Sequence, residues 1–380
     1  MTTPNIPATQ NTTASTIADR ARAGEPIGVG IIGLGSSPDS WAETAHLPAL
    51  RAVPGYEIRG VSASSHQSAR IAAERHGIPH AFASAAELAA HDSIDLVVVS
   101  VRVPLHAAAI SAVLGSRKII FSEWPLAVDT AEAKALTDQA AALGVRTAVG
   151  LQARFNPPVV YLRDLIADGY VGEVLSSNLI GSGGYWGPET AAVDVYLLAE
   201  NNGATMRSIA FGHALDALSL VFGEPNDLRV EQATRRTQVR NTDTDLLVPM
   251  TAADQVWFSG RTPTGAVLTG HYRGGRWRGT NLLWEILGTG GEIRVTAPSG
   301  HLQVQPLHLQ GARGADSSLS DLPVPEEYVR VQGIDPVRQS QAFIVAHTYE
   351  QLLSDLKEGT SVVPTWEHAV RRHTSIQLSG

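Results

Sequence analysis

The chain has 380 residues, 43% hydrophobic and 17% charged, with a formal net charge of −8 at pH 7. This length exceeds one ordinary hydrophobic core and predicts two domains. The negative charge and the lack of a dense basic run argue against a nucleic-acid surface. The sequence contains no cysteine, which excludes disulfides, thiolate metal sites and cysteine nucleophiles.

The first 24 residues are rich in Thr, Ala, Pro and Asn and lack the apolar region of a signal peptide. We expect a disordered leader over residues 1–24. No window of 18 uninterrupted apolar residues predicts a transmembrane span. A cytoplasmic location is the default expectation.

The stretch from residue 27 to residue 50 organises the first half of the chain. Residues 27–32 are apolar and predict a buried strand, and a helix is expected to begin near Trp41. Gly33 and Gly35 lie in the turn between them, where bare N–H groups at a helix N-terminus can bind a pyrophosphate. The third position of this G-x-G-x-x-G frame is a proline, so the motif is degenerate. A glycine-rich turn that binds no ligand is the alternative interpretation.

Strand and helix patterns then alternate with short loops, which is typical of a doubly wound parallel sheet. The predicted strands span residues 56–63, 94–101, 118–122 and 145–149, and the predicted helices span residues 67–76, 85–90, 106–114 and 129–143. The strand at 94–101 is a continuous apolar run, as expected where both sheet faces are covered. We therefore expect an α/β Rossmann dinucleotide-binding domain over residues 25–150.

After residue 150 the pattern changes to antiparallel strands. The predicted strands span residues 174–180, 228–236, 254–259, 266–273, 284–288, 291–296 and 302–307, and the predicted helices span 157–168, 209–222, 337–357 and 365–378. We expect an α+β domain over residues 151–380 with a large, open-faced, mostly antiparallel sheet. This domain would bind substrate and dimerise, and its last helix can pack back near the Rossmann domain. Ligands usually bind in a cleft between two such domains.

Several motifs occur together, and their combination is more specific than any one of them. They are Gly-Ile-Ile-Gly-Leu-Gly at 30–35, Phe-Ser-Glu-Trp-Pro-Leu-Ala at 121–127, the segment 151–174 that begins Leu-Gln-Ala-Arg-Phe-Asn-Pro-Pro, and Phe-Gly-His-Ala-Leu-Asp at 211–216. With these motifs the chain resembles the Gfo/Idh/MocA oxidoreductases from residue 27 to the C-terminus. Within that family it looks most like the branch of the yeast galactose-pathway repressors and their bacterial relatives. That branch shares the lengthened nucleotide turn and the Gly-Gly-Tyr-Trp-Gly at 183–187.

The chain departs from the catalytic pattern of that family at two positions. Family enzymes typically carry Glu-Lys-Pro, whose lysine helps to polarise the reacting hydroxyl or carbonyl, and here Trp124 replaces that lysine. An indole N–H donates one hydrogen bond but has no charge and cannot shuttle a proton. Ile209 stands where the family commonly has an aspartate, so only His213 of the usual Lys/Asp/His group remains. Losing the charged donor removes electrostatic stabilisation of a developing alkoxide.

The candidate catalytic residues are His213 and Asp216. A proton must move with any hydride, and His213 is the candidate acid/base because histidine titrates near neutrality. Asp216 lies one helical turn away and is expected to orient His213 or bind substrate. Arg154, Tyr185, Trp186 and His213 itself are the candidate substrate-binding residues, since aromatic rings between glycines suit stacking on a sugar. A hydrogen-bonded histidine at the domain interface is the alternative for His213.

The candidate cofactor-binding residues lie in the first turn and at the predicted carboxyl ends of strands. By resemblance, Glu123 contacts the nicotinamide ribose, His106 lies near the nicotinamide and Gln152 faces the cleft. The full set is Gly33, Gly35, Ser36, Ser37, Trp41, Ser64, Ser65, Arg102, His106, Glu123, Trp124 and Gln152. A surface role is the alternative for Arg102 and His106. No metal site is expected, because no His/Asp/Glu cluster has ligand spacing.

The end of the second predicted strand bears on the choice of cofactor. It lacks the acidic residue that usually binds the ribose 2′-OH of NAD. Ser64, Ser65 and Arg70 could accept a 2′-phosphate, which favours NADP slightly over NAD. The expected cofactor is therefore NAD(P), with a slight preference for NADP.

Two functions fit these residues. The first is an NAD(P)-dependent oxidoreductase that transfers hydride to or from a sugar, polyol or related carbonyl or hydroxyl compound. The second is a non-catalytic NAD(P)-binding regulator or sensor, which Trp124 and Ile209 favour. The family as a whole places the enzyme slightly ahead. We expect a small, sugar-like substrate, no nucleic acid or membrane partner, and a homo-oligomer (a dimer or a dimer of dimers) that pairs through the C-terminal sheet.

Overall fold

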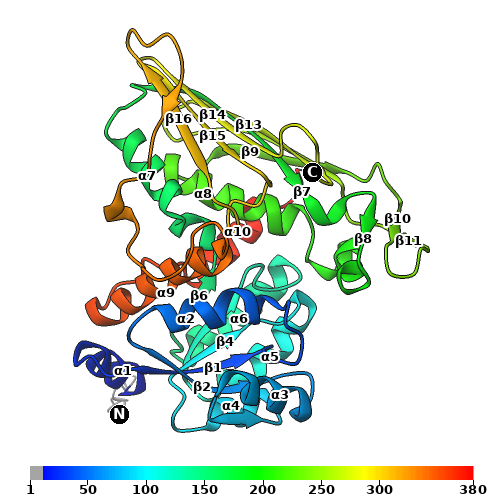
Figure 1. The fold of residues 1–380 in the computed structure, drawn as a ribbon, viewed down its shortest axis with the longest axis vertical. Helices are drawn as coiled ribbons and strands as arrows, with labels where there is room; N and C mark the ends of the chain where they lie inside the picture. Colours follow the sequence, from blue (N-terminus) through cyan, green and yellow to red (C-terminus); the bar gives the residue numbers. More distant parts are fainter. Residues whose placement is uncertain (1–11, 380) are drawn as a thin grey trace, which may run out of the picture.

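Six parallel strands form the first sheet of the computed structural model, which describes residues 12–379 (Figure 1). The strand order β3-β2-β1-β4-β5-β6 is that of a doubly wound dinucleotide-binding sheet and confirms the predicted fold class. The strands are β1 (Ile27–Ile32), β2 (Tyr56–Ser62), β3 (His80–Phe82), β4 (Leu96–Val99), β5 (Ile119–Glu123) and β6 (Thr147–Gly150). Strands β1, β4 and β5 are buried along their whole length, because helices cover both faces of the sheet.

The helices of this half follow the predicted alternation. They are α2 (Leu47–Ala52), α3 (His66–His76), α4 (Ala85–Ala90), α5 (His106–Leu114) and α6 (Thr130–Ala142). Ser65, Ser84 and Asp129 cap α3, α4 and α6 by accepting a backbone N–H three residues on. The helix expected to begin near Trp41 starts instead as a π-helical turn (Ala42–His46), and α2 follows it. Such turns often occur at functional sites.

The second half is built on an eight-stranded sheet of order β17-β16-β15-β14-β7-β13-β12-β9. All its neighbours pair antiparallel except β7 and β13, which confirms a mostly antiparallel sheet. The strands are β7 (Val174–Gly183), β9 (Asn226–Ala233), β12 (Gln255–Arg261), β13 (Val267–Gly274), β14 (Leu282–Gly288), β15 (Gly291–Ala297), β16 (His308–Arg313) and β17 (Ser320–Asp321). The strand predicted at 302–307 is wrong. That segment is irregular, and pairing resumes only at β16.

One face of this sheet is packed and the other is open. Helices α7 (Pro157–Ala167) and α8 (Gly212–Phe222) lie on the packed side (Figure 1). Phe211, in the π-helical turn (Arg207–Phe211) before α8, stacks on Phe258 of β12 with ring centroids 5.0 Å apart. The opposite face exposes side chains such as Trp257, 37% exposed, and Leu287, 40% exposed.

A small three-stranded sheet was not predicted. It consists of β8 (Glu189–Thr190), β10 (Gln238–Asn241) and β11 (Leu247–Pro249), and a 3₁₀ helix (Ala192–Leu198) follows β8. These strands have only two to four residues, which is too short for a periodic pattern. The unit projects to one side of the large sheet (Figure 1).

The last two helices return to the first sheet. Helix α9 (Ser340–Glu358) packs into the same core cluster as β1 and α2, and Tyr349 stacks on Phe121 with ring centroids 5.3 Å apart. Helix α10 (Trp366–Ser375) lies against α6, and its Trp366 donates through Nε1 to the carbonyl of Ala148 in β6. The chain therefore crosses between the two sheets twice.

The predicted leader needs a correction. Residues 12–22 form helix α1 (Thr12–Arg22) instead of a disordered segment, while residues 1–11 lie outside the described part. Ile17 and Ala21 are buried in the core cluster of the first sheet, and Arg20 pairs with Asp95 at 2.9 Å. Two apolar side chains four residues apart on one helix face were the available signal.

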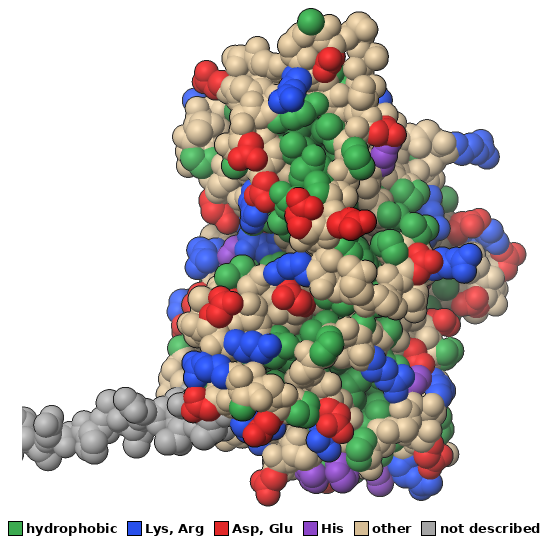
Figure 2. Space-filling model, turned by 60° about the vertical axis from the view of Figure 1, so that its left-hand side comes forward, with side chains coloured by type: hydrophobic (Ala, Val, Ile, Leu, Met, Phe, Trp, Pro, Cys, Tyr) green, Lys and Arg blue, Asp and Glu red, His purple; other side chains and the backbone are tan. Residues whose placement is uncertain are grey.

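Basic and acidic side chains are interspersed over the face drawn in Figure 2, with no field of a single sign. Within residues 12–379, no helix is both long and apolar enough to cross a bilayer.

Candidate functional site

The glycine turn after β1 is shaped by close backbone contacts. A Cβ on Gly33, whose φ is +105°, would lie 2.1 Å from the carbonyl oxygen of Ser100. A Cβ on Gly35 would lie 2.7 Å from Ser68 Oγ, which also accepts the N–H of Ser36 at 2.8 Å. Only glycine fits position 33, whereas a side chain at position 35 would have to displace the Ser68 hydroxyl, which holds the turn against the start of α3.

Three buried polar atoms near this turn have no hydrogen-bond partner among the described residues. They are Ser100 Oγ just after β4, Trp41 Nε1 before the π-helical turn, and Gln152 Oε1 after β6. Buried polar atoms are normally paired, so these three mark a place where a ligand can complete the bonding. Ser100 was not among the predicted residues, because no motif singles out the serine in this buried apolar run.

Glu123 and Gln152 are brought together at the carboxyl ends of β5 and β6. Gln152 Nε2 donates to both carboxylate oxygens of Glu123, at 2.9 and 2.8 Å. Gly150 leaves room for that carboxylate, since a Cβ there would lie 2.5 Å from Glu123 Oε1. His46 Nε2 lies 3.1 Å from the same oxygen, and His46 Nδ1 lies 2.7 Å from the hydroxyl of Tyr349 in α9. Neither His46 nor Tyr349 was predicted, because no sequence motif links the segment before α2 to helix α9.

The end of β2 offers little to distinguish the two cofactors. Ser65 Oγ is engaged as the cap of α3, and Ser64 is exposed. Arg70 is exposed and pairs with Glu74 at 3.5 Å along the same helix. Arg75 instead reaches the turn and donates to the carbonyl of Ser36 at 2.9 Å.

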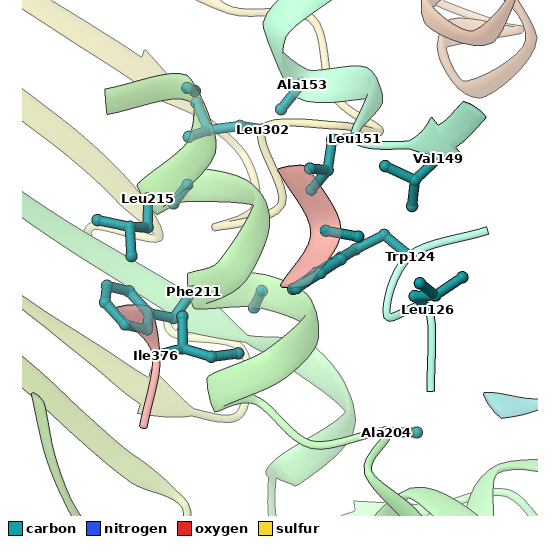
Figure 3. Close-up of a cluster of buried hydrophobic side chains, with 14 of the residues drawn as sticks. Trp124, Leu126, Val149, Leu151, Ala153, Ala204, Phe211, Leu215, Leu302 and Ile376 are labelled. Atoms are coloured by element: carbon teal, nitrogen blue, oxygen red, sulfur yellow. The ribbon is translucent and has the colours of Figure 1, made fainter. Parts of the chain in front are cut away.

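Trp124 points at the second domain (Figure 3). It is only 4% exposed, and its indole N–H donates to the carbonyl of Ser208 at 2.8 Å. Its ring lies on His373 of α10 with centroids 4.6 Å apart, and the bare Cα of Gly212 admits the indole to the start of α8. The single donor that replaces the expected lysine is therefore used inside the protein, and it is not free to polarise a substrate.

His106 and Arg102 also have protein partners. His106 is 1% exposed, and its two ring nitrogens lie 2.9 Å from the carbonyl of Val101 and 3.3 Å from that of Leu126. Arg102 leaves the first sheet, stacks over the ring of Tyr196 at 4.5 Å and donates to the carbonyl of Val193. Arg102 thus connects the rim of the first domain to the 3₁₀ helix of the second.

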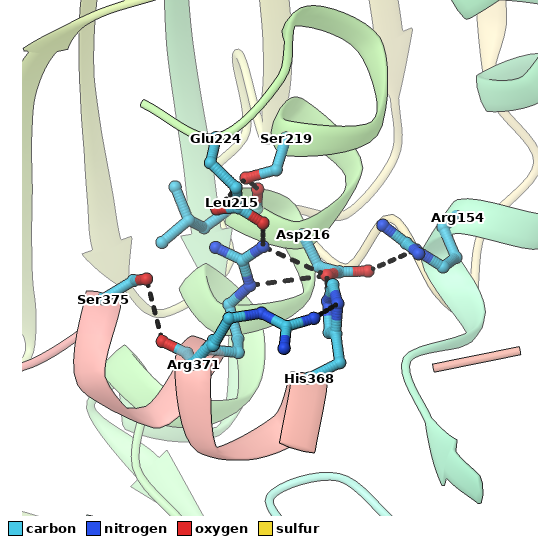
Figure 4. A network of polar contacts seen from close by, with 9 residues as sticks. Arg154, Leu215, Asp216, Ser219, Glu224, His368, Arg371 and Ser375 are labelled. Carbon is cyan, nitrogen blue, oxygen red and sulfur yellow. Dashed lines mark hydrogen bonds and ion pairs between the residues drawn. The ribbon is translucent and has the colours of Figure 1, made fainter. Parts of the chain in front are cut away.

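Asp216 is the centre of a buried ionic cluster and does not bond to His213 (Figure 4). Its carboxylate accepts Arg154 Nε at 2.8 Å, His368 Nε2 at 2.7 Å and Arg372 Nη2 at 3.2 Å. Burial alone would raise the pKa of Asp216, but these cations outweigh it and hold that pKa well below its usual range. The prediction that Asp216 orients His213 through a hydrogen bond is wrong, because cations from two other elements take its oxygens.

His213 is buried in α8 with one free ring nitrogen. It is 3% exposed, and its Nδ1 has no hydrogen-bond partner among the described residues. Burial lowers the pKa of His213 to about 3, although the charge of Asp216 acts in the opposite direction. His301 lies close enough to lower that pKa as well, and its own Nε2 is buried without a partner, as is Gln303 Oε1. Neither His301 nor Gln303 was predicted as a site residue, because residues 302–307 were expected to form a strand.

Tyr185 and Trp186 take different roles. Tyr185 is 46% exposed and meets His301 edge-on with centroids 6.0 Å apart, so it stays a candidate for stacking on a ligand. Trp186 is fully buried and donates to the carbonyl of Leu197, so the predicted stacking role does not fit it. Trp277 lies in the β13–β14 loop and is 45% exposed.

Two family models match this chain. Residues 27–151 match the Gfo/Idh/MocA model, described as an oxidoreductase family with an NAD-binding Rossmann fold. Residues 157–297 match the model of the Gal80p C-terminal domain. Together they cover the first sheet and the second sheet as far as β15.

Named relatives fall into two functional groups. The dehydrogenase aclE of Aspergillus oryzae is 35% identical over 203 residues, 52% of this chain, and the match spans about half of that relative (55%). The galactose/lactose metabolism regulatory protein GAL80 of Saccharomyces cerevisiae is 26% identical over 368 residues, 89% of this chain and 84% of GAL80.

Solved structures share the fold. A super-repressor mutant of Gal80p from Saccharomyces cerevisiae superposes with a TM-score of 0.82 at 23% identity, covering 92% of this chain and 94% of that one. Levoglucosan dehydrogenase in complex with NADH and levoglucosan gives 0.76 at 20% identity, covering 93% and 95%. At these identities the likeness shows the fold alone.

The buried histidines predict that the protein loses stability in mild acid. Burial lowers the pKa of His213 to about 3, and of His301 and His373 to about 4, from an ordinary 6.5. Below pH 6.5 the unfolded chain therefore binds protons that the folded chain does not. The contribution of these residues is fully present above pH 6.5 and falls towards pH 4, by up to about 1.4 kcal/mol per pH unit for each histidine.

Urea unfolding between pH 7.5 and 5.0 measures this slope. His373→Gln should make it shallower, while the same change at exposed His308 should leave it unaltered. An unfolding free energy that does not change over this range would contradict the assignment of neutral, buried histidines.

Proposed function

Since this chain belongs to the Gfo/Idh/MocA oxidoreductase family, we propose that its cleft binds a nicotinamide dinucleotide and that it oxidises a hydroxyl group of a sugar or polyol. The observation that carries this proposal is the buried Nδ1 of His213, near His301 Nε2 and Gln303 Oε1, because none of these three atoms has a hydrogen-bond partner among the described residues. Three buried polar atoms without a partner are costly unless a polar ligand completes them.

The residues of the first domain fit a dinucleotide. Gly33 keeps its turn close to the backbone of Ser100, and Ser100, Trp41 and Gln152 each hold a buried polar atom without a partner among the described residues. When bound, the nicotinamide supplies the hydride acceptor. Glu123 is the candidate for its ribose, with Gln152 and His46 fixing the carboxylate.

His213 is neutral at pH 7, so it can accept the hydroxyl proton of a substrate as the carbinol carbon loses hydride. A histidine of such low pKa is a weak base, and Trp124 adds no charge to stabilise an alkoxide. Loss of one such stabilising donor lowers kcat about 10²- to 10³-fold in other enzymes. We therefore expect slow turnover in the oxidation direction.

Either dinucleotide suits the observed turn. The slight preference for NADP rested on Ser64, Ser65 and Arg70, and only Ser64 keeps its side chain free of a partner among the described residues. We propose NAD(P) without a further choice, and comparison of the two dissociation constants decides it.

A regulator is the second candidate, and Trp124 favours it. An enzyme of this family needs a donor at that position, whereas here the indole joins the two domains through Ser208 and His373. A protein built this way binds the dinucleotide and reports it through the relative placement of the two sheets.

Titration with NAD⁺, NADH, NADP⁺ and NADPH, followed by a sugar and polyol panel read at the reduced-nicotinamide absorbance, separates the two candidates. We expect dinucleotide binding and slow turnover that His213→Asn reduces at least about 100-fold, as for loss of a general base, with unchanged dinucleotide affinity. His308→Asn is the matched control at an exposed histidine. Binding without turnover over the whole panel favours the regulator, and no dinucleotide binding at all would refute both.

The open face of the large sheet is proposed to pair with a second copy of the chain. Backbone register aligns Trp257, His271, Ile180 and Leu283 in one row across β12, β13, β7 and β14. Val267 and Leu287 lie on the same face and are 53% and 40% exposed, with Thr269 and Glu285 between them and that row. An exposed row of large apolar side chains suits an interface.

Light scattering after size-exclusion chromatography tests this pairing. The wild type should run at twice the 40.3 kDa of one chain. Leu283→Glu should give the monomer, because a charge would be buried in the interface, while Val362→Glu in an exposed loop should not. A monomeric wild type at micromolar concentration would contradict the proposal.

A further inference from the structure

The loop between β13 and β14 (residues 275–281) presents two arginines and a tryptophan around a hollow of about 570 Å³. The loop is braced. Asn281 Oδ1 accepts the N–H of Trp277 and Asn281 Nδ2 donates to its carbonyl, at 2.9 and 2.7 Å. Arg273 of β13 donates to the carbonyl of Thr280, and its guanidinium lies 5.7 Å from the centre of the Trp277 ring. We call residues 275–281 the arginine loop.

Arg276 in this loop adjoins the candidate substrate residues. A Cβ on Gly184 would lie 3.2 Å from Arg276 Nε and 3.5 Å from its Cγ, so the arginine stem lies on the backbone that carries Tyr185. Burial, together with the nearby charge of Arg276, lowers the pKa of His301 to about 4. His301 in turn acts on His213. His301 also meets Tyr185 edge-on with ring centroids 6.0 Å apart, so Arg276 and His301 both lie beside the segment that carries Tyr185.

The cationic groups here are unpaired. Among the described residues, Arg276 and Arg278 make no hydrogen bond or ion pair, whereas Arg154 and Arg207 in the same domain are bound to carboxylates. The buried Nε of Arg273 has no partner either, nor do His301 Nε2 and Gln303 Oε1. Arg276 and Arg278 carry positive charge with no counter-ion among the described residues, so this loop has N–H donors that lack an acceptor.

We propose that the arginine loop is an anion subsite of the substrate cleft, so that the substrate is a sugar derivative bearing a carboxylate or a phosphate. The anionic group is held by Arg276 while a hydroxyl lies at His213. This inference rests on the proposed function, because it extends the same cleft. A guanidinium presents paired N–H donors that match both carboxylate and phosphate. The two parallel hydrogen bonds that result can compete with hydrogen bonds to water.

The acidic side chain that acts on Tyr185 is Asp194, in the 3₁₀ helix after β8. Burial raises the pKa of Asp194, and the charge of Arg102 of the first domain opposes that rise. Arg102, and not Arg276, is the cation that acts on Asp194, so Asp194 does not neutralise Arg276.

Isothermal titration of the full chain with D-galactose, D-galacturonate and D-galactose 6-phosphate, with and without NADH, tests the subsite. The two charged probes separate a carboxylate from a phosphate requirement. We expect at least one of them to bind more than about tenfold more tightly than galactose, as for a hydrogen bond to a charged group. Arg276→Gln should weaken that probe by about ten- to a hundredfold and leave galactose unchanged.

Arg261→Gln is the matched control, because this substitution removes the same charge. Arg261 is exposed at the end of β12 that lies away from the arginine loop. The subsite is overturned if galactose binds as tightly as both charged sugars, if neither charged sugar binds, or if Arg276→Gln leaves the preference intact. Arg276-dependent binding without turnover supports the subsite and refutes the oxidoreductase. Turnover of neutral sugars without a charge preference supports the oxidoreductase and refutes the subsite.

Discussion

The buried carboxylate of Asp216 is the interaction on which the arrangement of this cleft depends. It joins three elements that are far apart in the chain, since it lies on α8 and accepts Arg154 from the crossover after β6 and both His368 and Arg372 from α10. Arg372 is 1% exposed and also reaches Glu224. A buried charge cluster of this kind is costly to form and more costly to break, so it fixes one relative placement of the elements it joins. Asp216, which the family motif suggests for catalysis, therefore holds in place helix α8, which also carries His213.

The polar side chains around the cleft form two sets: those that bond to other groups of the protein and those that keep an atom without a partner. Trp124, His106 and Trp186 have their nitrogens bonded to, or facing, backbone carbonyls, and all three act as structural contacts. Ser100, Gln152, His213, His301 and Gln303 keep a buried atom without a partner among the described residues. This division explains how a chain without the usual lysine can keep a polar cleft. The named relatives comprise a dehydrogenase and GAL80 regulators.

The residue patterns predicted five of the six strands of the first sheet and most of the second, while β3, of three residues, was too short for a pattern. Glu123 and Gln152 follow strand ends that converge at one sheet edge and are hydrogen-bonded there, but their assignment to a cofactor came from the family resemblance. Prediction failed where the contact is long-range. The Asp216 cluster, the approach of Tyr349 to His46, and His301 beside His213 each join segments more than 60 residues apart, and no local pattern records them. Helix α1 and the small sheet were missed because short elements depend on tertiary packing.

The most direct measurement is the unfolding free energy of Asp216→Asn, with NADH affinity determined on the same preparation. If Asp216 is a structural link, stability falls by about 3–5 kcal/mol, because Arg154 and Arg372 lose a buried counter-charge, while the folded protein still binds NADH. Asp138→Asn, which breaks an exposed pair with Lys134, should change neither quantity. Unchanged stability together with loss of turnover would contradict the account and return Asp216 to the catalytic group.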